Sequence, residues 1–451
     1  MSTTTGQGEL RRRAVSGFAL YDVAASAFVT VVITAIGGPF VTSLAEAAQD
    51  ADGRVALLGL SPSSQSVYAY ALSASVVLQV LAMPLLGVLA DLADAKRRVL
   101  LAGTLLGALA TVALAGLPGG QVLPALALLV LANAAFGVAL LAYNAYLADV
   151  AELADRDRVS ARGFAAGYAG GAVVLAVALA LVSAHDALGL TTAGAGRVSI
   201  ALAGLWWLVL GIVAVRRLDA ARELPGARVA PVGPPATQLR ESLRLLRELP
   251  GTARYLASFL LFNDAIQAVI GLSSVFLTFE LYTSRGRDAD DATGFLLSLV
   301  LLIQVVAVVG ALGCGRLAAR YGARQVLLAT IALWVGVLLY AALVLDSAAQ
   351  AYGLGIVIAL VLGGSQSLAR SLFSSMVPDD RQASFFAFFQ LAERGTAFVG
   401  PLLFGIVYDV TGDYSYALLS LAILLLAGGA LLATTDTDRA VAAAQAPARR
   451  G

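Results

Sequence analysis

The chain has very few of the side chains that build reactive or metal-binding sites. Cys314 is its only cysteine and His185 its only histidine among 451 residues. A single cysteine excludes an intrachain disulfide and any metal site made of several thiolates. Membrane-embedded hydrolases and metal enzymes need clustered His, Cys or carboxylate groups, and no nucleotide-binding loop of the form G-x-x-x-x-G-K-[ST] occurs. The sequence therefore predicts no enzyme, no cofactor, no bound metal and no direct use of ATP.

Charge is also scarce, because charged residues make up 13% of the chain against 59% hydrophobic residues. Long apolar sequence is abundant instead. Roughly 20 apolar residues cross a bilayer as a helix, and a backbone inside lipid must satisfy its own hydrogen bonds. Twelve stretches have about this length: 17–40, 67–90, 99–117, 122–148, 163–184, 198–215, 255–279, 292–315, 326–345, 351–376, 384–408 and 415–433. We therefore predict an all-α membrane protein with twelve transmembrane helices.

The few basic residues are unevenly distributed between the predicted loops. With the helices counted in order, 24 of the 30 Lys and Arg residues fall on one side of the membrane and four on the other. The positive-inside rule then places both termini in the cytoplasm, which requires an even number of helices. One lysine against 29 arginines hints at a GC-rich bacterial genome, and so at the cell (inner) membrane. The net charge of +1 indicates no nucleic-acid partner.

A charged segment with prolines at 225, 231, 234 and 235 divides the predicted helices into two groups of six. It is the only long cytoplasmic loop, and its last part, 237–249, places leucines on one helical face and arginines elsewhere. This pattern is typical of a helix on the membrane surface. We therefore expect an N-terminal six-helix bundle at 1–215, a cytoplasmic linker with an amphipathic helix at 216–252, and a C-terminal six-helix bundle with a cytoplasmic tail at 253–451.

The two halves also resemble one another. Val99 and Val326, each followed by two leucines, are 227 residues apart. The same offset separates Tyr146 near the end of the fourth predicted helix from Phe373 near the end of the tenth. Two landmarks at one offset near half the chain indicate an internal duplication, and hence two pseudo-symmetric bundles.

Several short motifs resemble those of a known family of permeases. The segment Gly87-Val-Leu-Ala-Asp91, with Lys96-Arg97-Arg98 after it, resembles the loop signature G-x-L-A-D-R-x-G-R-R of the major facilitator superfamily. Five further motifs resemble the vacuole-effluxer-like, autophagy-related branch of that superfamily. They begin at Tyr21 (Y-D-V-A-A-S-A-F), Tyr143 (Y-N-A-Y-L), Ser160 (S-A-R-G-F-A-A-G-Y), Gln366 (Q-S-L-A-R-S-L-F) and Gly400 (G-P-L-L-F-G).

The resemblance implies a secondary transporter that moves a small polar solute by alternating access. Vacuolar members of the branch export amino acids, so efflux is the favoured direction. We expect coupling to protons or another ion, a lipid bilayer around the chain, and a monomer. Export of sugars or drugs is the strongest rival, and lipid transport or scrambling is a weaker one. A pore would more naturally show charged rings or filter segments.

Two aspartates fall inside predicted spans, where a charge costs about 2.5–3.5 kcal/mol at the bilayer centre on insertion scales. Asp22 lies in the first helix and Asp264 in the first helix of the second half. Tyr21 and Asn263, which directly precede them, are candidates for the same site. Such residues face a cavity or a partner, and burial disfavours their charged form. Either carboxyl group could then take up a proton near neutral pH, which proton-coupled transport needs. The alternative for Asp22 is a structural role near the helix start, paired with the arginines at 11–13.

Other polar groups inside the spans are candidates for contacting the solute. Arg370 and Glu393 lie at similar depths of the tenth and eleventh helices. As a closed pair they join the helices; if the pair opens, Arg370 could hold a substrate carboxylate. The neutral candidates suit a polar solute, although each one singly is more often an interhelical hydrogen bond. They are Ser26, Asn133, Tyr143, Asn144, Gln267, Gln304, Gln366 and Gln390.

Charged residues at the cytoplasmic ends of the spans form the predicted inner gate. Asp91, at the end of the second helix, could meet the positive N-terminal end of the eleventh helix and hold the halves closed. The basic members of the gate are Lys96, Arg97, Arg98, Arg320 and Arg324. A plain positive-inside anchor is the alternative role for these cations.

Glycines mark two helices for close packing or bending. Gly163, Gly167 and Gly171 recur every four residues, which is typical of a tightly packed helix face. Gly400-Pro401 is expected to bend the eleventh helix, since proline removes a backbone hydrogen bond.

Overall fold

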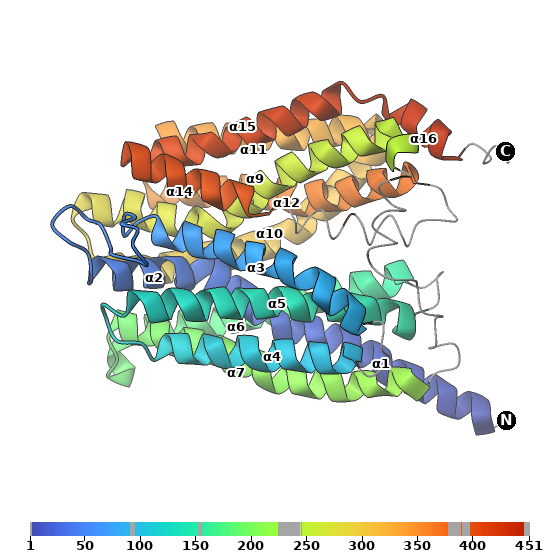
Figure 1. Ribbon diagram of the computed structural model, residues 1–451, viewed down its shortest axis with the longest axis horizontal. Helices are drawn as coiled ribbons and strands as arrows, with labels where there is room; N and C mark the ends of the chain where they lie inside the picture. The colour runs from blue at the N-terminus through green and yellow to red at the C-terminus, as the bar shows by residue number, and fades with distance from the viewer. Residues whose placement is uncertain are drawn as a thin grey trace. The chain divides into compact units, whose positions relative to one another are not determined.

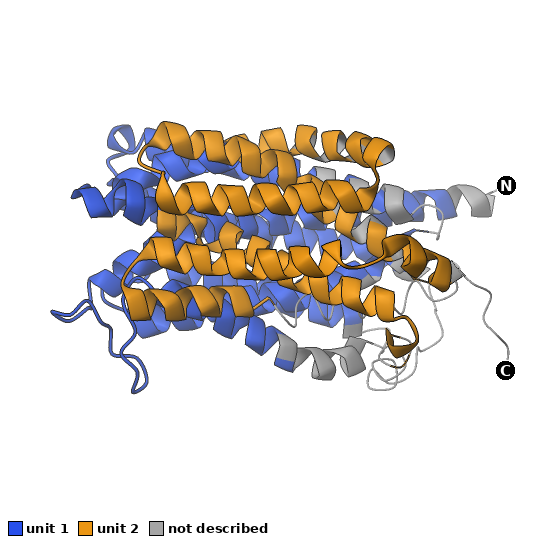
Figure 2. Ribbon diagram, turned by 90° about the horizontal axis from the view of Figure 1, so that it is seen from above, with its two compact units in different colours: residues 1–233, 277–301 blue, residues 234–276, 302–451 orange. Residues whose placement is uncertain are grey.

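The computed structural model describes residues 2–90, 95–151, 156–223, 244, 246–377, 389 and 397–445. The chain forms two compact units, Met1–Gly233 with Leu277–Leu301 and Pro234–Phe276 with Leu302–Gly451 (Figure 2). Most of each unit therefore comes from one half of the sequence. The middle of the predicted linker, 224–243, lies outside the described residues, so its amphipathic helix stays a prediction.

The helices of the first half share one compact unit (Figure 1). In chain order they are α1 (Ser2–Ala27), the π-helix η1 (Phe28–Ile36), α2 (Gly37–Glu46), α3 (Val67–Ala90), α4 (Ala95–Ala115), α5 (Val122–Val150), α6 (Arg156–Ser183), η3 (Asp186–Leu188), α7 (Thr192–Leu218) and η4 (Asp219–Glu223). α1 packs against α6 and α7, and α4 packs against α5 and α7. The first long helix of this half thus packs against its last two long helices.

The second half contributes the remaining helices. They are α9 (Pro250–Leu281), η5 (Thr283–Arg285), η6 (Ala289–Asp291), α10 (Ala292–Tyr321), α11 (Ala323–Leu343), α12 (Ala348–Ser375), α14 (Val399–Thr411), α15 (Tyr414–Ala433) and α16 (Thr437–Gln445). Within the second unit, α15 packs against both α11 and α14. α9 and α10 each contribute to both units, because residues 277–301 group with the first.

The described helices match the predicted spans. Ten helical segments are long and apolar enough to cross a membrane, and Val67–Gln79 and Val399–Thr411 are shorter apolar helices. Each of the twelve predicted stretches overlaps with one of these segments. For the eleventh stretch this holds only for its last part, because residues 384–388 and 390–396 lie outside the described part of the chain. The predicted all-α membrane fold is confirmed.

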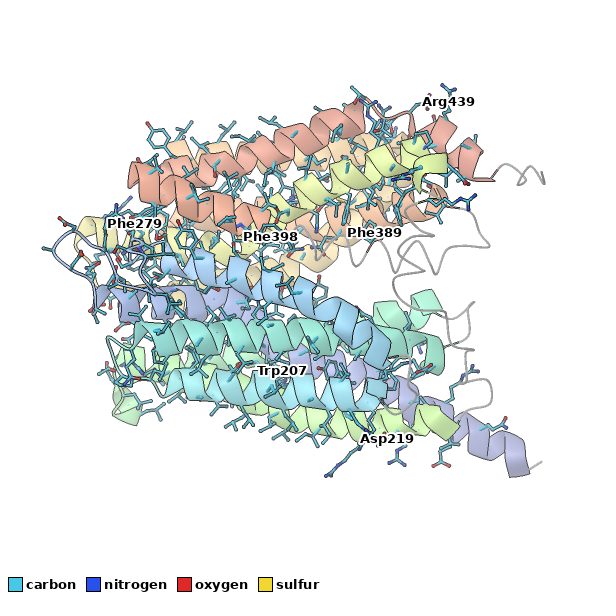
Figure 3. The ribbon with its side chains drawn as sticks, viewed as in Figure 1. Trp207, Asp219, Phe279, Phe389, Phe398 and Arg439 are labelled. Atoms are coloured by element: carbon cyan, nitrogen blue, oxygen red, sulfur yellow. The ribbon has the colours of Figure 1, made fainter. Side chains whose placement is uncertain are left out.

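Aromatic and small residues fill the interior of the first unit. Trp207 lies on α7 (Figure 3) and is fully buried. Its ring centroid lies 5.2 Å from that of Phe28 and 5.8 Å from that of Phe136. A Cβ added at Gly107 on α4 would collide with the Trp207 ring. Since lipid gives helices no hydrophobic reason to associate, close contacts of this kind hold them together. They also fix the position of α1, which carries the first candidate residue.

Candidate functional site

The carboxyl group of Asp22, on α1, lies in a polar cluster inside the first unit. The Tyr143 hydroxyl of α5 lies 2.5 Å from Asp22 Oδ2 and 3.1 Å from the backbone oxygen of Phe18. The Tyr143 ring stacks on those of Phe18 and Tyr21, with centroids 4.3 and 4.9 Å away. Tyr143 is 2% exposed, and Asp22 is half-buried. Aromatic packing therefore holds the hydroxyl against the carboxyl group.

Two glycines of α6 allow the carboxyl group to reach Tyr143. A Cβ added at Gly163 would collide with Asp22 Oδ2 and would lie 3.3 Å from the Tyr143 hydroxyl. A Cβ added at Gly167 would lie 3.3 Å from Asp22 Cβ. The predicted close-packing face of α6 thus contacts Asp22 through its first two glycines, so the same feature serves packing and the candidate site.

The hydroxyl of Tyr21 reaches α4. It lies 2.9 Å from Thr104 Oγ1, and Thr104 donates its own proton to the Leu100 carbonyl at 2.7 Å. Because Thr104 has only one proton to give, Tyr21 is the donor in this pair. Tyr21 is 1% exposed. In this structure it joins α1 to α4 and supports the Tyr143 ring.

Asp264, on α9, caps the first turn of α14 in the second unit. Its Oδ2 accepts a 2.8 Å hydrogen bond from the backbone N–H of Gly400, the second residue of that helix. The positive end of the helix dipole stabilises a negative charge at this position. The residue is 3% exposed, and Oδ1 has no hydrogen-bond partner among the described residues. Asp264 therefore has one satisfied and one unsatisfied oxygen in a buried position.

The Gly400-Pro401 pair lies at the start of α14. The helix begins at Val399, so Pro401 falls in the first turn, where a missing N–H breaks no intrahelical bond. A Cβ added at Gly400 would lie 2.7 Å from Ala268 Cβ and 3.1 Å from the Asp264 backbone oxygen. Glycine is therefore what allows α14 to approach α9 at Asp264.

Both carboxyl groups thus contact residues of the motifs that the sequence analysis singled out. The family model for vacuole effluxer Atg22-like proteins matches residues 10–445. The chain belongs to the Atg22-like vacuole effluxer family. The match covers both predicted halves, so the resemblance inferred from short motifs is confirmed.

The Atg22-like chain has relatives in bacteria and fungi. It is 26% identical over 430 residues to the MFS-type transporter YxiO of Bacillus subtilis. That alignment covers 94% of this chain and 96% of the relative. It is 29% identical over 316 residues to autophagy-related protein 22-1 of Aspergillus fumigatus. That alignment covers 64% of this chain and 49% of the relative. The chain thus spans almost all of the bacterial relative and about half the length of the fungal one.

Solved transporters share the fold of the Atg22-like chain. The nucleoside transporter NupG matches with a TM-score of 0.64 and 13% identity, over 96% of this chain and 98% of that one. A D-xylose-proton symporter matches with a TM-score of 0.65 and 12% identity, over 94% and 97%. Likeness at such low identity shows the fold alone. Together with the family, it shows a multi-pass MFS-type transporter rather than an enzyme.

Other predicted solute-site residues of the Atg22-like chain lie elsewhere on its helices. Ser26 donates to the Val23 oxygen of its own helix at 3.0 Å. Asn263 is buried, with 4% of its surface exposed. The remaining described candidates are half-buried: Asn144, Gln267, Gln304 and Gln366. Gln390, Glu393 and the side chain of Arg370 lie outside the described residues, so the pairing of Arg370 with Glu393 stays a prediction.

A second polar cluster joins α3 to α5, and the sequence analysis identified only one of its members. Asn133 Nδ2 donates to Ser75 Oγ at 2.6 Å, and Gln79 Nε2 donates to the Asn133 backbone oxygen at 3.1 Å. A Cβ added at Gly137 would collide with the Gln79 side chain. The sequence does contain a signal for the other two members, because Ser75 and Gln79 are polar residues four positions apart in an apolar span. This cluster holds two helices together by interhelical hydrogen bonds.

Two basic residues of the predicted gate form ion pairs within the first unit. Lys96 Nζ lies 2.6 Å from Asp149 Oδ2. Arg97 Nε lies 2.7 Å from Oδ1 of Asp219, directly after α7 (Figure 3). Arg98 is exposed, and Asp91 lies outside the described residues. These contacts join helix ends inside one unit, and the gate itself stays a prediction.

The basic gate residues of the second half also contact their own unit. Arg324 Nε donates to the Leu432 oxygen at 3.3 Å, and Arg324 Nη2 donates to the Ala433 oxygen at 2.5 Å. These are the last two residues of α15, where a cation meets the negative end of the helix dipole. The Arg320 guanidinium lies 5.3 Å from the centroid of the neighbouring Tyr321 ring.

Proposed function

We propose that this Atg22-like transporter exports small polar solutes, amino acids first among them, by alternating access coupled to proton movement. The family description, vacuole effluxer, supports the export direction. Two six-helix bundles around a shared site are the usual architecture of alternating access in this type of transporter. The bacterial relative YxiO supports a cell-membrane location, and the distribution of basic residues supports cytoplasmic termini. We propose a monomer that acts without a nucleic-acid partner.

Proton coupling is supported by one hydroxyl group that lies between two acceptors. A tyrosine has a single O–H proton, yet the Tyr143 oxygen lies within hydrogen-bond distance of both Asp22 Oδ2 and the Phe18 backbone oxygen. When Asp22 is ionised, Tyr143 donates to the carboxylate and leaves Phe18 without this partner. When Asp22 is protonated, the carboxyl group donates to Tyr143, which then donates to Phe18. Both contacts are satisfied together only when Asp22 carries a proton.

The surroundings of Asp22 favour a proton over a cationic side chain as its charge partner. α5 contributes Tyr143, and α1 itself contributes Tyr21, which is stacked on the Tyr143 ring. α6 contributes glycines, and the neutral Trp206 of α7 donates to the next residue of α1. Among the described residues, no Lys or Arg forms an ion pair with Asp22. A partly buried charge without a partner is costly, and proton uptake removes that cost.

We assign the two acidic residues different roles. Asp22 carries the proton, because its hydrogen bond to Tyr143 changes donor when the charge changes. Asp264 holds the start of α14, because the Gly400 N–H and the helix dipole both favour its charged form. Its unsatisfied Oδ1 makes it the second candidate for a proton. Protonation of Asp22 thus alters a bond between α1 and α5, which links a proton to helix packing.

The test uses purified protein in liposomes loaded with labelled amino acids. We expect export that is driven by an inwardly directed proton gradient and accompanied by proton uptake, which a pH-sensitive dye reports. Asp22→Asn should abolish gradient-driven export. Asp186→Asn is the matched control, because the Asp186 side chain, at the start of η3, is 95% exposed. Export by Asp22→Asn at the wild-type rate overturns the proton assignment. Transport of sugars or lipids in place of amino acids overturns the solute assignment.

A further inference from the structure

The first membrane span is not a uniform α-helix. α1 changes at Phe28–Ile36 into the π-helix η1, and α2 continues without a break in the same span. One backbone hydrogen bond marks the wider turn, and one side-chain hydrogen bond spans the same number of residues. The Gly37 N–H donates to the Val32 oxygen, and the Thr34 hydroxyl donates to the Val29 oxygen at 2.9 Å, each five residues back. π-Helices are rare and occur frequently at functional sites.

Side chains from two other helices donate to backbone oxygens of this span. Trp206 Nε1 of α7 donates to the Val23 oxygen at 2.9 Å. The Tyr68 hydroxyl of α3 donates to the Ile33 oxygen at 2.8 Å. An unsatisfied backbone oxygen inside a bilayer costs several kcal/mol. The Val23 oxygen, five residues before η1, also accepts from the Ser26 hydroxyl, so Trp206 is its second side-chain donor. Tyr68 supplies a donor to Ile33 inside η1, and together the two aromatic side chains stabilise the present backbone form.

A glycine closes the π-helix. A Cβ added at Gly37 would collide with the Val32 backbone oxygen and would lie 3.2 Å from Val32 Cγ1. In the interior of an ordinary α-helix, alanine is about 1 kcal/mol more favourable than glycine. Glycine at this position therefore permits the π form while weakening the competing α form.

The part of the span next to Asp22 is held by close contacts. A Cβ added at Gly170 of α6 would lie 2.7 Å from Val23 Cγ1. Phe28, at the first position of η1, is fully buried and packs against Phe136 and Trp207. α2 follows the π-helix and packs against α3 and α5. A change in η1 would therefore move α2 relative to an anchored Asp22.

We propose that the first span changes its hydrogen-bond register during transport, with η1 converting between π and α, and with Trp206 and Tyr68 as positioning residues for the π form. When the backbone N–H groups of η1 donate four residues back in place of five, the hydrogen-bond register of the span shifts by one residue. One residue of an α-helix corresponds to about 100° of rotation and 1.5 Å of rise. The inference rests on the proposed function only in that transport requires a change of conformation.

The test measures the accessibility of α2 in the full-length purified protein. Cys314→Ser removes the only native cysteine, and single cysteines at positions 39–46 are then labelled with a maleimide. In this structure Thr42 is buried and Ser43 is half-buried. We expect the labelling rates in the Cys314→Ser background to follow this pattern. We expect Gly37→Ala to displace the whole pattern by one residue, because its Cβ excludes the π form.

A second variant tests the same idea without touching the span itself. Trp206→Phe combined with Tyr68→Phe removes both donors and keeps two aromatic rings, so it should produce the same one-residue displacement even if Gly37→Ala does not fold. Gly336→Ala on α11 is the matched control, because nothing lies within 4 Å of a Cβ added there. An unchanged pattern in monodisperse protein overturns the inference. Labelling needs neither solute nor proton gradient, so this failure is distinct from failure of the proposed export.

Discussion

Arg97 and Arg324 lie 227 residues apart and make the same connection, each in its own unit. Each lies in the first turn of a helix and binds the end of the last membrane-spanning helix of its half. Arg97 binds Asp219, directly after α7, and Arg324 binds the terminal carbonyl groups of α15. The offset of 227 residues between similar sequence motifs thus also separates two similar contacts. This is what the predicted duplication would leave behind: one junction with two different acceptors.

The first prediction concerns the stability of this junction. Arg324→Ala should lower the free energy of unfolding by about 1 kcal/mol for each lost hydrogen bond. Arg97→Ala should cost less, about 0–1 kcal/mol, because the side chains of that pair are 33% and 36% exposed. Thermal unfolding in detergent measures both. Arg439→Ala, at an exposed position of α16, is the control, and a larger loss for Arg97→Ala than for Arg324→Ala would contradict this ranking.

The second prediction concerns the pH dependence of transport. Tyr143→Phe removes a charge-assisted hydrogen bond from ionised Asp22 and a weaker neutral one from protonated Asp22, so the neutral form of the carboxyl group gains relative to the charged one. The carboxyl group then keeps its proton to higher pH, and the pH midpoint of export should move upward. Export rates measured between pH 5 and about 9 report the midpoint. A rate that falls equally at every pH would indicate a structural role for Tyr143 only.

The third prediction concerns the glycine beside Asp22. Gly163→Ala places a Cβ against Asp22 Oδ2 and should separate the carboxyl group from Tyr143. A hydrogen bond to a charged group contributes about 1.5–3 kcal/mol, so export should slow about 10- to 100-fold. Gly353→Ala on α12 is the matched control, since a Cβ added there meets nothing within 4 Å. Equal rates for the two variants would show that the Asp22–Tyr143 contact is dispensable.

The fourth prediction separates two roles of Asp264. Asp264→Asn keeps an oxygen that can accept from the Gly400 N–H, whereas Asp264→Ala leaves that buried donor unsatisfied. We expect Asp264→Ala to lose about 1–3 kcal/mol of stability and Asp264→Asn to lose clearly less. Thermal unfolding compares them, and export by Asp264→Asn should continue if Asp22 alone carries the proton. Loss of gradient-driven export in a stable Asp264→Asn protein would assign the proton to Asp264 instead.

The candidate site could be predicted only in part. Asp22 and Asp264 are visible in the sequence because an acid in an apolar stretch is costly. Gly163 and Gly167 are visible as a packing pattern, but not as the residues that contact Asp22. Tyr143 belongs to a recognisable motif, but nothing near it in the sequence identifies its acceptor. The roles of Trp206 and Tyr68 left no sequence signal at all, since aromatic residues are common in membrane spans.

The sequence by itself determined the class of protein and its membrane spans and predicted the duplication, because apolar length, charge asymmetry and repeat offset are read along the chain. Only the tertiary structure decided which groups meet. Tyr143 lies 121 residues from Asp22, Gly400 lies 136 from Asp264, and Trp206 lies 183 from Val23. The tertiary structure also decided that the first span widens into a π-helix. Hydrogen-bond partners across a bundle depend on how helices pack, and packing is a property of the whole chain.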